Sequence, residues 1–183
     1  MSATHDEKTS EFSIAAIVYS EHGVADNLLA EFALGLRREG WHVQGLVQQK
    51  KDGHGKAATM LIDLETEKCY PLFPNPPSNP DSCSLDPGSI ADASIALRRA
   101  LETRADLAIA NHFGALEADG KGLIAEMLAL MTGGIPLLTA VPSDYLMDWR
   151  SFSGHASVEL PPEMGALREW FASIMTGNSP LRK

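Results

Sequence analysis

The 183-residue sequence has little of what several classes of protein require. Its only cysteines, Cys69 and Cys83, form no CxxC pair, and we expect two reduced thiols. No apolar run approaches the roughly 20 residues that a membrane-spanning helix needs. The N-terminus is polar and lacks the apolar segment of a secretory signal. These absences favour a cytoplasmic protein that does not enter a membrane.

Clusters of basic residues are also scarce. The net charge is −9, and the basic clusters are three pairs, Arg37-Arg38, Lys50-Lys51 and Arg98-Arg99. A nucleic-acid partner requires clustered Lys and Arg to neutralise its phosphates. The charge distribution therefore argues against a protein that binds nucleic acid.

The remaining composition is that of one globular domain. Hydrophobic residues make up 44% and charged residues 21%, which is ordinary for such a protein. The length is sufficient to bury a substantial core. We expect one domain over residues 12–175, with an N-terminal tail at 1–11 and a C-terminal tail at 176–183.

Apolar strands alternate with amphipathic helices along the chain. Nearly continuous apolar runs, typical of strands buried on both faces of a parallel sheet, lie at 12–19, 41–48, 107–110 and 135–141. Helical spacing occurs over 25–39, 86–103, 123–131 and 162–174. A hairpin is predicted over 59–64 and 68–73, and a short strand at 157–160. Asp86 is expected to cap its helix, with Pro87 at the first position. The pattern predicts a three-layer α/β fold with a mostly parallel sheet and an inserted β-hairpin.

The first strand, turn and helix have the layout of a phosphate-binding loop but not its residues. The Walker A pattern is G-x-x-x-x-G-K-[ST], whose Lys reaches the β and γ phosphates. Ser20 and Ala25 stand at the two Gly positions, Asp26 at the Lys position and Asn27 at the Ser/Thr position. Two unit charges about 4 Å apart interact by roughly 4 kcal/mol at an effective dielectric constant of about 20, so replacing Lys by Asp is not neutral. We expect a degenerate Walker A in which Asp26 can itself cap the helix.

A second polar group follows the strand at 107–110. Ligands of open α/β sheets bind outside the carboxyl ends of strands, which makes this loop a candidate site. The residues delivered to this strand end are Asn111, His112, Glu117, Asp119 and Lys121. Lys121, between Gly120 and Gly122, is a candidate for contacting an anion, or a plain loop lysine.

His22 and His112 both follow strands that we expect to be neighbours. They either share a metal site with Asp26 or Glu117 or are two unrelated surface histidines. Trp149 and Phe152 form a lid over the site or belong to the core, and we favour the core. Cys83 is expected to be a small buried residue under the Asp86 cap rather than a nucleophile.

Three segments resemble a bacterial family of unknown function that is grouped with the P-loop NTPases and often encoded beside molybdate-transport genes. These segments are Ser82–Gly88, Asn111–Gly114 with Glu117–Leu123, and Thr139–Pro142. The resemblance covers residues 12–171 and implies a P-loop-NTPase-like fold. That family usually has Gly at position 82 and basic residues at 84, 112 and 115, where this chain has Ser82, Ser84, His112 and Ala115.

The order of elements is more distantly similar to the small nucleoside-triphosphatase family. In that family an acidic pair at the central strand end coordinates Mg²⁺ and polarises water, and here Asn111 and His112 occupy that position. Glu117 matches the acidic residue of the following loop. The resemblance makes Glu117 the candidate catalytic carboxylate, with a solvated or helix-capping Glu as the alternative.

We interpret the chain as a non-hydrolytic protein that binds an oxyanion or a nucleotide, and the resemblance links it to molybdate or molybdenum metabolism. The candidate ligand-binding residues are Ser20, Glu21, His22, Gly23, Asp26, Asn27, Asn111, His112, Gly114, Gly120 and Lys121. A weak Mg²⁺-dependent nucleoside triphosphatase that uses Glu117 is one alternative. An interaction module with a vestigial cleft, for example a homodimer, is another. The pattern assigns no cofactor.

Overall fold

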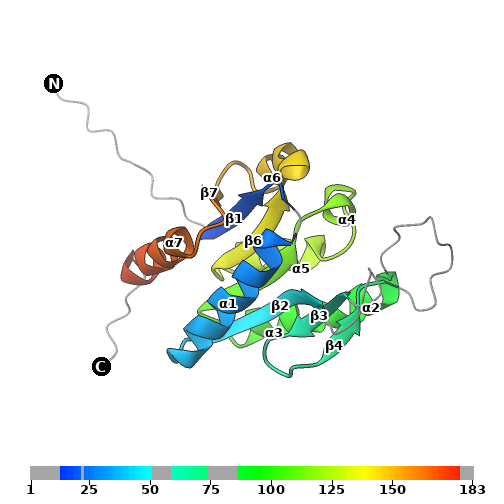
Figure 1. Cartoon of the computed structure of the whole chain (residues 1–183), viewed down its shortest axis with the longest axis horizontal. Coiled ribbons are helices and arrows are strands. Elements are labelled where there is room, and N and C mark those ends of the chain that lie inside the picture. Colours follow the sequence, from blue (N-terminus) through cyan, green and yellow to red (C-terminus); the bar gives the residue numbers. More distant parts are fainter. Residues whose placement is uncertain (1–12, 22, 51–58, 74–85, 178–183) are drawn as a thin grey trace.

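A computed structural model describes residues 13–21, 23–50, 59–73 and 86–177, and seven strands and seven α-helices are found there (Figure 1). The strands are β1 (Ile14–Tyr19), β2 (Val43–Lys50), β3 (Thr59–Asp63), β4 (Cys69–Pro71), β5 (Leu107–His112), β6 (Leu137–Pro142) and β7 (Val158–Leu160). The helices are α1 (Val24–Arg38), α2 (Pro87–Ala93), α3 (Ile95–Glu102), α4 (Ala115–Ala118), α5 (Ile124–Thr132), α6 (Leu146–Phe152) and α7 (Met164–Gly177), with a 3₁₀ turn, η2, at Ser143–Tyr145.

The seven strands form one sheet in the order β4-β3-β2-β5-β6-β1-β7. The strands from β2 to β7 in this order pair in parallel, and β3 and β4 add an antiparallel hairpin beside β2. This arrangement confirms the mostly parallel sheet and the inserted hairpin. The expectation that the first and central strands are neighbours is wrong, because β6 lies between β1 and β5.

Helices cover both faces of the sheet and bury two separate hydrophobic clusters. On one face α1 and α7 meet, with Phe32 and Phe171 in edge-to-face contact at 6.2 Å. On the other face, α2, α3, α5 and α6 bury residues such as Leu97, Met127 and Trp149. The two clusters make this a three-layer α/β fold, as predicted. Among the described helices none has the length and apolarity needed to cross a membrane.

Trp149 belongs to this second cluster, as the sequence favoured. Its side chain is fully buried and its ring lies 5.3 Å from that of Phe113 and 5.9 Å from that of Phe152. The preference for core over lid is therefore confirmed at Trp149, and Phe152 packs against the same cluster.

The helix expected over 86–103 is divided in two at Ser94. Asp86 caps α2 as predicted, since its carboxylate accepts hydrogen bonds from the backbone N–H groups of Gly88 and Ser89. The Ser94 hydroxyl donates to the Ala91 carbonyl at 2.7 Å and accepts from Arg98 at 2.6 Å. A serine hydroxyl that bonds nearby backbone in this way competes with the helical pattern, which explains the interruption.

A buried ion pair ties the β3–β4 hairpin to α3. Arg99 donates from Nη1 and Nη2 to the two carboxylate oxygens of Asp63 at 3.1 and 3.0 Å. Asp63 also accepts from the backbone N–H groups of Glu65 and Thr66 and from the Thr66 hydroxyl. Burial alone raises the pKa of the Asp63 carboxyl, but the hydrogen bonds from Arg99, Glu65 and Thr66 outweigh burial and hold that pKa below its usual value. The fully buried carboxylate is thus ionised and saturated with donors.

We predict that Asp63→Asn lowers the free energy of unfolding by roughly 3 kcal/mol at pH 7, because it leaves Arg99 without its buried counter-charge. The native pKa of Asp63 is depressed, so its stabilisation is present above the unfolded-state value near 4 and is lost as pH falls through the lower native value. Urea denaturation from pH 7 to pH 2 measures both effects.

Glu39→Gln is the matched control, since Glu39 forms an exposed pair with Arg168 on the surface. It should change the free energy of unfolding by less than about 1 kcal/mol. Equal losses for the two variants would contradict the assignment of a structural role to the Asp63–Arg99 pair.

Candidate functional site

The N-terminus of α1 has no side-chain cap. Its N-cap is Gly23, whose φ of 86° is in the left-handed region that glycine tolerates. Asp26 lies in the first turn, but its carboxylate accepts hydrogen bonds from Gln48 and His112. The expectation that Asp26 caps α1 is therefore wrong: the two side-chain donors hold the carboxylate over the strand ends. Ser20 is not part of this arrangement, since its hydroxyl donates to that of Ser143 at 3.3 Å.

A continuous row of five polar side chains crosses the carboxyl ends of the strands. Asn111 Nδ2 lies 3.5 Å from Gln48 Oε1, and Gln48 Nε2 donates to Asp26 Oδ2 at 3.0 Å. Asp26 Oδ1 lies 2.5 Å from His112 Nε2, and His112 Nδ1 lies 2.8 Å from the Tyr19 hydroxyl. We call these residues, Asn111, Gln48, Asp26, His112 and Tyr19, the polar row. It links α1 to β1, β2 and β5.

The orientation of the polar row follows from Asp26. A carboxylate can only accept, so His112 Nε2 and the Gln48 amide nitrogen must point toward it. The Gln48 carbonyl oxygen then faces Asn111, and the Asn111 amide nitrogen must face Gln48. Through this chain of constraints Asp26 fixes which atom of each neighbouring side chain faces the next.

Tyr19 closes the row in its neutral form. The side chain is buried, and its ring meets the His112 ring edge-on at 5.6 Å. Burial, and secondarily the negative charge of Asp26, raise the pKa of Tyr19 to about 12. At neutral pH the phenol therefore keeps its proton and remains a hydrogen-bond partner for His112.

A bulge at the end of β5 directs Asn111. Ile109 pairs with Leu138 and His112 with Ala140, so three steps along β5 match two along β6. Asn111 lies in this bulge with a φ of 45°, a left-handed conformation that Asn tolerates better than most residues. The buried Thr139 hydroxyl is within hydrogen-bond distance of the Ala110 and Asn111 carbonyls, at 3.4 and 3.2 Å. Bulges re-aim side chains at active sites, and this one presents the Asn111 amide to the cavity described next.

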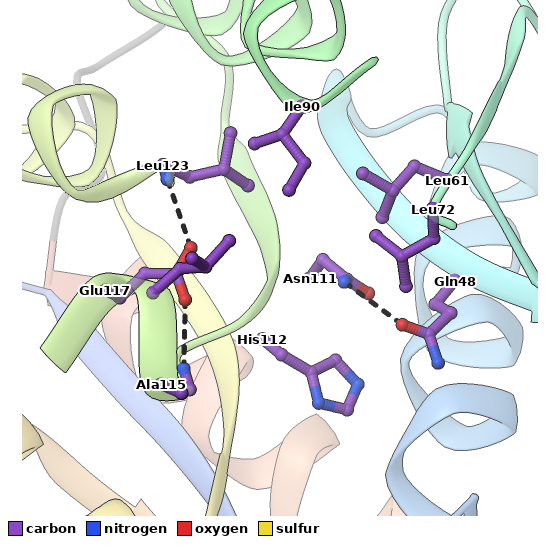
Figure 2. A pocket seen from close by; sticks show the side chains of 11 residues that line it. Gln48, Leu61, Leu72, Ile90, Asn111, His112, Ala115, Glu117 and Leu123 are labelled. Atoms are coloured by element: carbon purple, nitrogen blue, oxygen red, sulfur yellow. Dashed lines mark hydrogen bonds between the residues drawn. The ribbon is translucent and has the colours of Figure 1, made fainter. Parts of the chain in front are cut away.

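A cavity of about 150 Å³ lies between this strand end, the hairpin and α4 (Figure 2). Its walls are mainly apolar and include Leu61, Leu72, Ile90, Leu116 and Leu123. Its polar lining consists of Gln48, Asn111, His112 and Glu117. The cavity therefore adjoins the polar row on the β2 side, away from the turn before α1.

Glu117 holds the loop around this cavity closed. Its two carboxylate oxygens accept from the backbone N–H groups of Gly114 and Leu123, each at 3.1 Å (Figure 2). Gly122 has a φ of 61°, and a Cβ there would lie 2.2 Å from a Glu117 oxygen, so only glycine fits beside this clamp. This geometry matches the helix-capping alternative, because Gly114 is the N-cap of α4 and Glu117 accepts a hydrogen bond from its backbone N–H. The sequence did not predict the short helix α4. The catalytic role of Glu117 stays a prediction.

The other predicted site residues are dispersed. Glu21, Asn27 and Lys121 are exposed. Gly120 lines a second cavity, of about 300 Å³, on the side of α4 that faces Phe152 and Asp148. His22 and Cys83 lie outside the described residues. The predicted residues that the structure brings together are Asp26, Asn111, His112, Gly114 and Glu117.

Tyr19, Gln48 and Thr139 were missed as site residues. Tyr19 and Gln48 lie near the carboxyl ends of β1 and β2, which is the position that identified Asn111 and His112. Applying the same rule to each strand would have found them.

Within the described ranges no three His, Cys, Asp or Glu residues are arranged to hold a metal ion. Both ring nitrogens of His112 are already occupied, by Tyr19 and Asp26. The shared metal site stays a prediction at His22, and it would require His112 to release one of these partners.

The model of a family described as "Protein of unknown function (DUF2478)" matches residues 14–170. The chain belongs to the DUF2478 family. It is 38% identical over 176 residues to the molybdenum import ATP-binding protein ModC 2 of Bradyrhizobium diazoefficiens. That alignment covers 93% of this chain but 19% of the relative, so the DUF2478 chain spans about a fifth of the length of ModC 2.

Two solved structures share the fold. A human cancer-related nucleoside triphosphatase has a TM-score of 0.61 at 17% identity, covering 93% of this chain and all of that one. THEP1 from the hyperthermophile Aquifex aeolicus has a TM-score of 0.60 at 15% identity, covering 91% of this chain and all of that one. At these identities the likeness shows the fold alone. Together the matches confirm the predicted family of unknown function and the P-loop-NTPase-like fold.

We predict that Asp26→Ala lowers the free energy of unfolding by about 2 kcal/mol, because it leaves the partly buried donors of Gln48 and His112 without their acceptor. Asn27→Ala is the matched control, since Asn27 is the next residue of the same helix turn and is exposed. That substitution should stay within about 0.5 kcal/mol of the parent. Denaturant unfolding measures both, and similar values would show that the polar row contributes little to stability.

We predict that one of the three tyrosines titrates near pH 12, well after an ordinary tyrosine, and that Tyr19→Phe removes that late phase. Because the native pKa of Tyr19 is raised, its contribution to stability is complete below about pH 10 and declines as pH rises toward 12. Ultraviolet absorbance measures phenolate formation, and circular dichroism at each pH confirms that the chain is folded. Loss of the late phase in Tyr145→Phe instead would contradict the assignment.

Proposed function

We propose that this chain is a non-hydrolytic binding protein that takes a nucleotide in the cleft beside the polar row, in the service of molybdate import. The observation that carries the proposal is the contact of 2.5 Å between Asp26 and His112. Asp26 stands at the Lys position of the Walker pattern. Hydrogen bonds from Gln48 and His112 hold its carboxylate at that position.

This pair opposes hydrolysis on two counts. A P-loop lysine stabilises charge on the β and γ phosphates, and a carboxylate in its place repels that charge. A hydrolase also needs acidic residues at the strand end to hold Mg²⁺. This chain has Asn111 and His112 there, and both ring nitrogens of His112 are bonded to Tyr19 and Asp26. The chain thus keeps the shape of a nucleotide site without the groups that activate phosphate.

A nucleotide fits the cleft better than an isolated oxyanion does. Molybdate and similar oxyanions offer only acceptors at neutral pH, whereas Asp26, Glu117 and the Asn111 oxygen are acceptors too. A nucleotide carries N–H donors on its base, which can enter the cavity while its phosphates remain toward solvent. The link to molybdate is supported by the relative, a protein named for molybdenum import and ATP binding.

The test is a thermal-shift panel on the whole chain with ATP, GTP, ADP, molybdate, tungstate and sulfate, with and without Mg²⁺, and a phosphate-release assay on the same samples. We expect a nucleotide to raise the melting temperature and no phosphate release above buffer. A ligand at a hundredfold excess over its Kd adds about 2.7 kcal/mol to the free energy of unfolding.

Each other outcome identifies an alternative. Mg²⁺-dependent phosphate release that Glu117→Gln abolishes and the exposed control Glu102→Gln preserves would overturn the proposal in favour of a weak nucleoside triphosphatase. A shift with molybdate and none with nucleotides would overturn the choice of ligand. An interaction module would give no shift with any compound, and a mass of two chains by light scattering would then identify a homodimer.

A further inference from the structure

Among the described residues that line the cavity beside the polar row, one buried side-chain polar atom has no hydrogen-bond partner. Asn111 Oδ1 is buried and accepts no hydrogen bond from any residue that the structure describes. The whole residue is only 6% exposed. A buried carbonyl oxygen without a donor costs on the order of 1–3 kcal/mol, so this oxygen is expected to receive its donor from a group other than the described residues.

The direction of this oxygen is fixed rather than arbitrary. Amide oxygen and nitrogen atoms are distinguished by their hydrogen bonds. The Gln48 nitrogen donates to Asp26, so the Gln48 oxygen faces Asn111 and requires the Asn111 nitrogen on that side. Rotating the Asn111 amide by half a turn would place two acceptor oxygens, those of Asn111 and Gln48, against each other. The oxygen left over is therefore the Asn111 atom offered to the ligand.

The other walls specify an uncharged, compact ligand. Five of the lining side chains are Leu or Ile, and an apolar cavity of about 150 Å³ in another protein accepts benzene. Each oxygen of Glu117 already accepts a hydrogen bond from a backbone N–H group, and a carboxylate has no proton to donate to an anion.

From this geometry we infer that the cavity at the end of β5 binds an uncharged ring of about the size of benzene that donates an N–H or O–H hydrogen bond to Asn111 Oδ1. The inference rests on the proposed binding function and names the ligand chemistry of its cavity. The base of a nucleotide and a separate small molecule share this chemistry, and competition with ATP distinguishes the two sources.

The test uses fluorine NMR with three probes of matched shape: para-fluoroaniline, which donates, para-fluorotoluene, which does not, and para-fluorobenzoate, which is an anion. We expect the aniline to bind about tenfold more tightly than the toluene, since a hydrogen bond to a buried group is worth about 1.4 kcal/mol. The benzoate should bind more weakly than either. Equal affinities for aniline and toluene, a preference for benzoate, or no binding of any probe would each overturn the inference.

Two variants separate the hydrogen bond from the cavity. Asn111→Gly removes the acceptor and accommodates the positive φ at that position, so the preference for aniline over toluene should disappear while both still bind. Ile90→Phe fills the cavity and should abolish binding of both probes. Ile95→Phe is its matched control, because Ile95 is 52% exposed on α3, and it should bind them as the parent does.

Competition with ATP completes the experiment. Displacement of the aniline by ATP would support a nucleotide base as the source of the ring, and binding of ATP without displacement would support a separate molecule. If ATP shifts the melting temperature of the parent and of Ile90→Phe equally while no ring binds, the inference fails, and nucleotide binding stands without the base in this cavity. If the aniline binds with its donor preference but no nucleotide does, the cavity chemistry stands and the proposed nucleotide ligand fails.

Discussion

The hydrogen bond between Asp26 and His112 is the contact on which the arrangement of the strand ends depends. It joins the first turn of α1 to the end of β5, two strands away from β1 in the sheet. Because a carboxylate can only accept, this one side chain sets the orientation of His112 and Gln48, and through Gln48 that of Asn111. A lysine at this position would donate instead of accept and would reverse the orientation of each partner. The polar row and a phosphate-gripping loop are thus mutually exclusive uses of the same helix turn.

The fold could be predicted because its signals are local. Continuous apolar strands, helical spacing and the Asp86-Pro87 helix start are each contained in fewer than about 15 residues, which is the window over which hydrophobic periodicity is informative. The predictions that failed needed knowledge of partners distant in sequence. The strand order between β1 and β5 depends on where β6 inserts, and nothing in the two strands themselves encodes it. The break between α2 and α3 depends on a hydrogen bond from the Ser94 hydroxyl to the Ala91 carbonyl.

The sequence predicted the location of the site better than it predicted the hydrogen-bond partners of the site residues. The rule that ligands bind at the carboxyl ends of strands found Asn111 and His112, because their positions follow directly from the end of an apolar run, and the Walker A spacing found Asp26. The sequence offered Asp26 as a helix cap, a ligand-binding residue or a shared metal ligand but did not predict its hydrogen bond to Gln48, since its partners, Gln48 and His112, are 22 and 86 residues away. The bulge that aims Asn111 was also invisible, because it arises from a mismatch in pairing between β5 and β6. The hydrogen-bond partners of a side chain at a strand end depend on the neighbouring strands, and the register of those strands could not be predicted from the sequence.

Under the proposed function, phosphate chemistry and ligand binding depend on different parts of the P-loop-like fold. Phosphate activation depends on hydrogen-bond donors and cations that converge on the phosphates at the start of α1. One reversed charge at that point removes this electrostatic stabilisation. Binding of an apolar ring depends instead on the walls formed by the hairpin, α2 and the Glu117 loop, none of which contains Asp26. The bulge in β5 connects the two regions, because Asn111 and His112 both line the cavity and His112 is also bonded to Asp26.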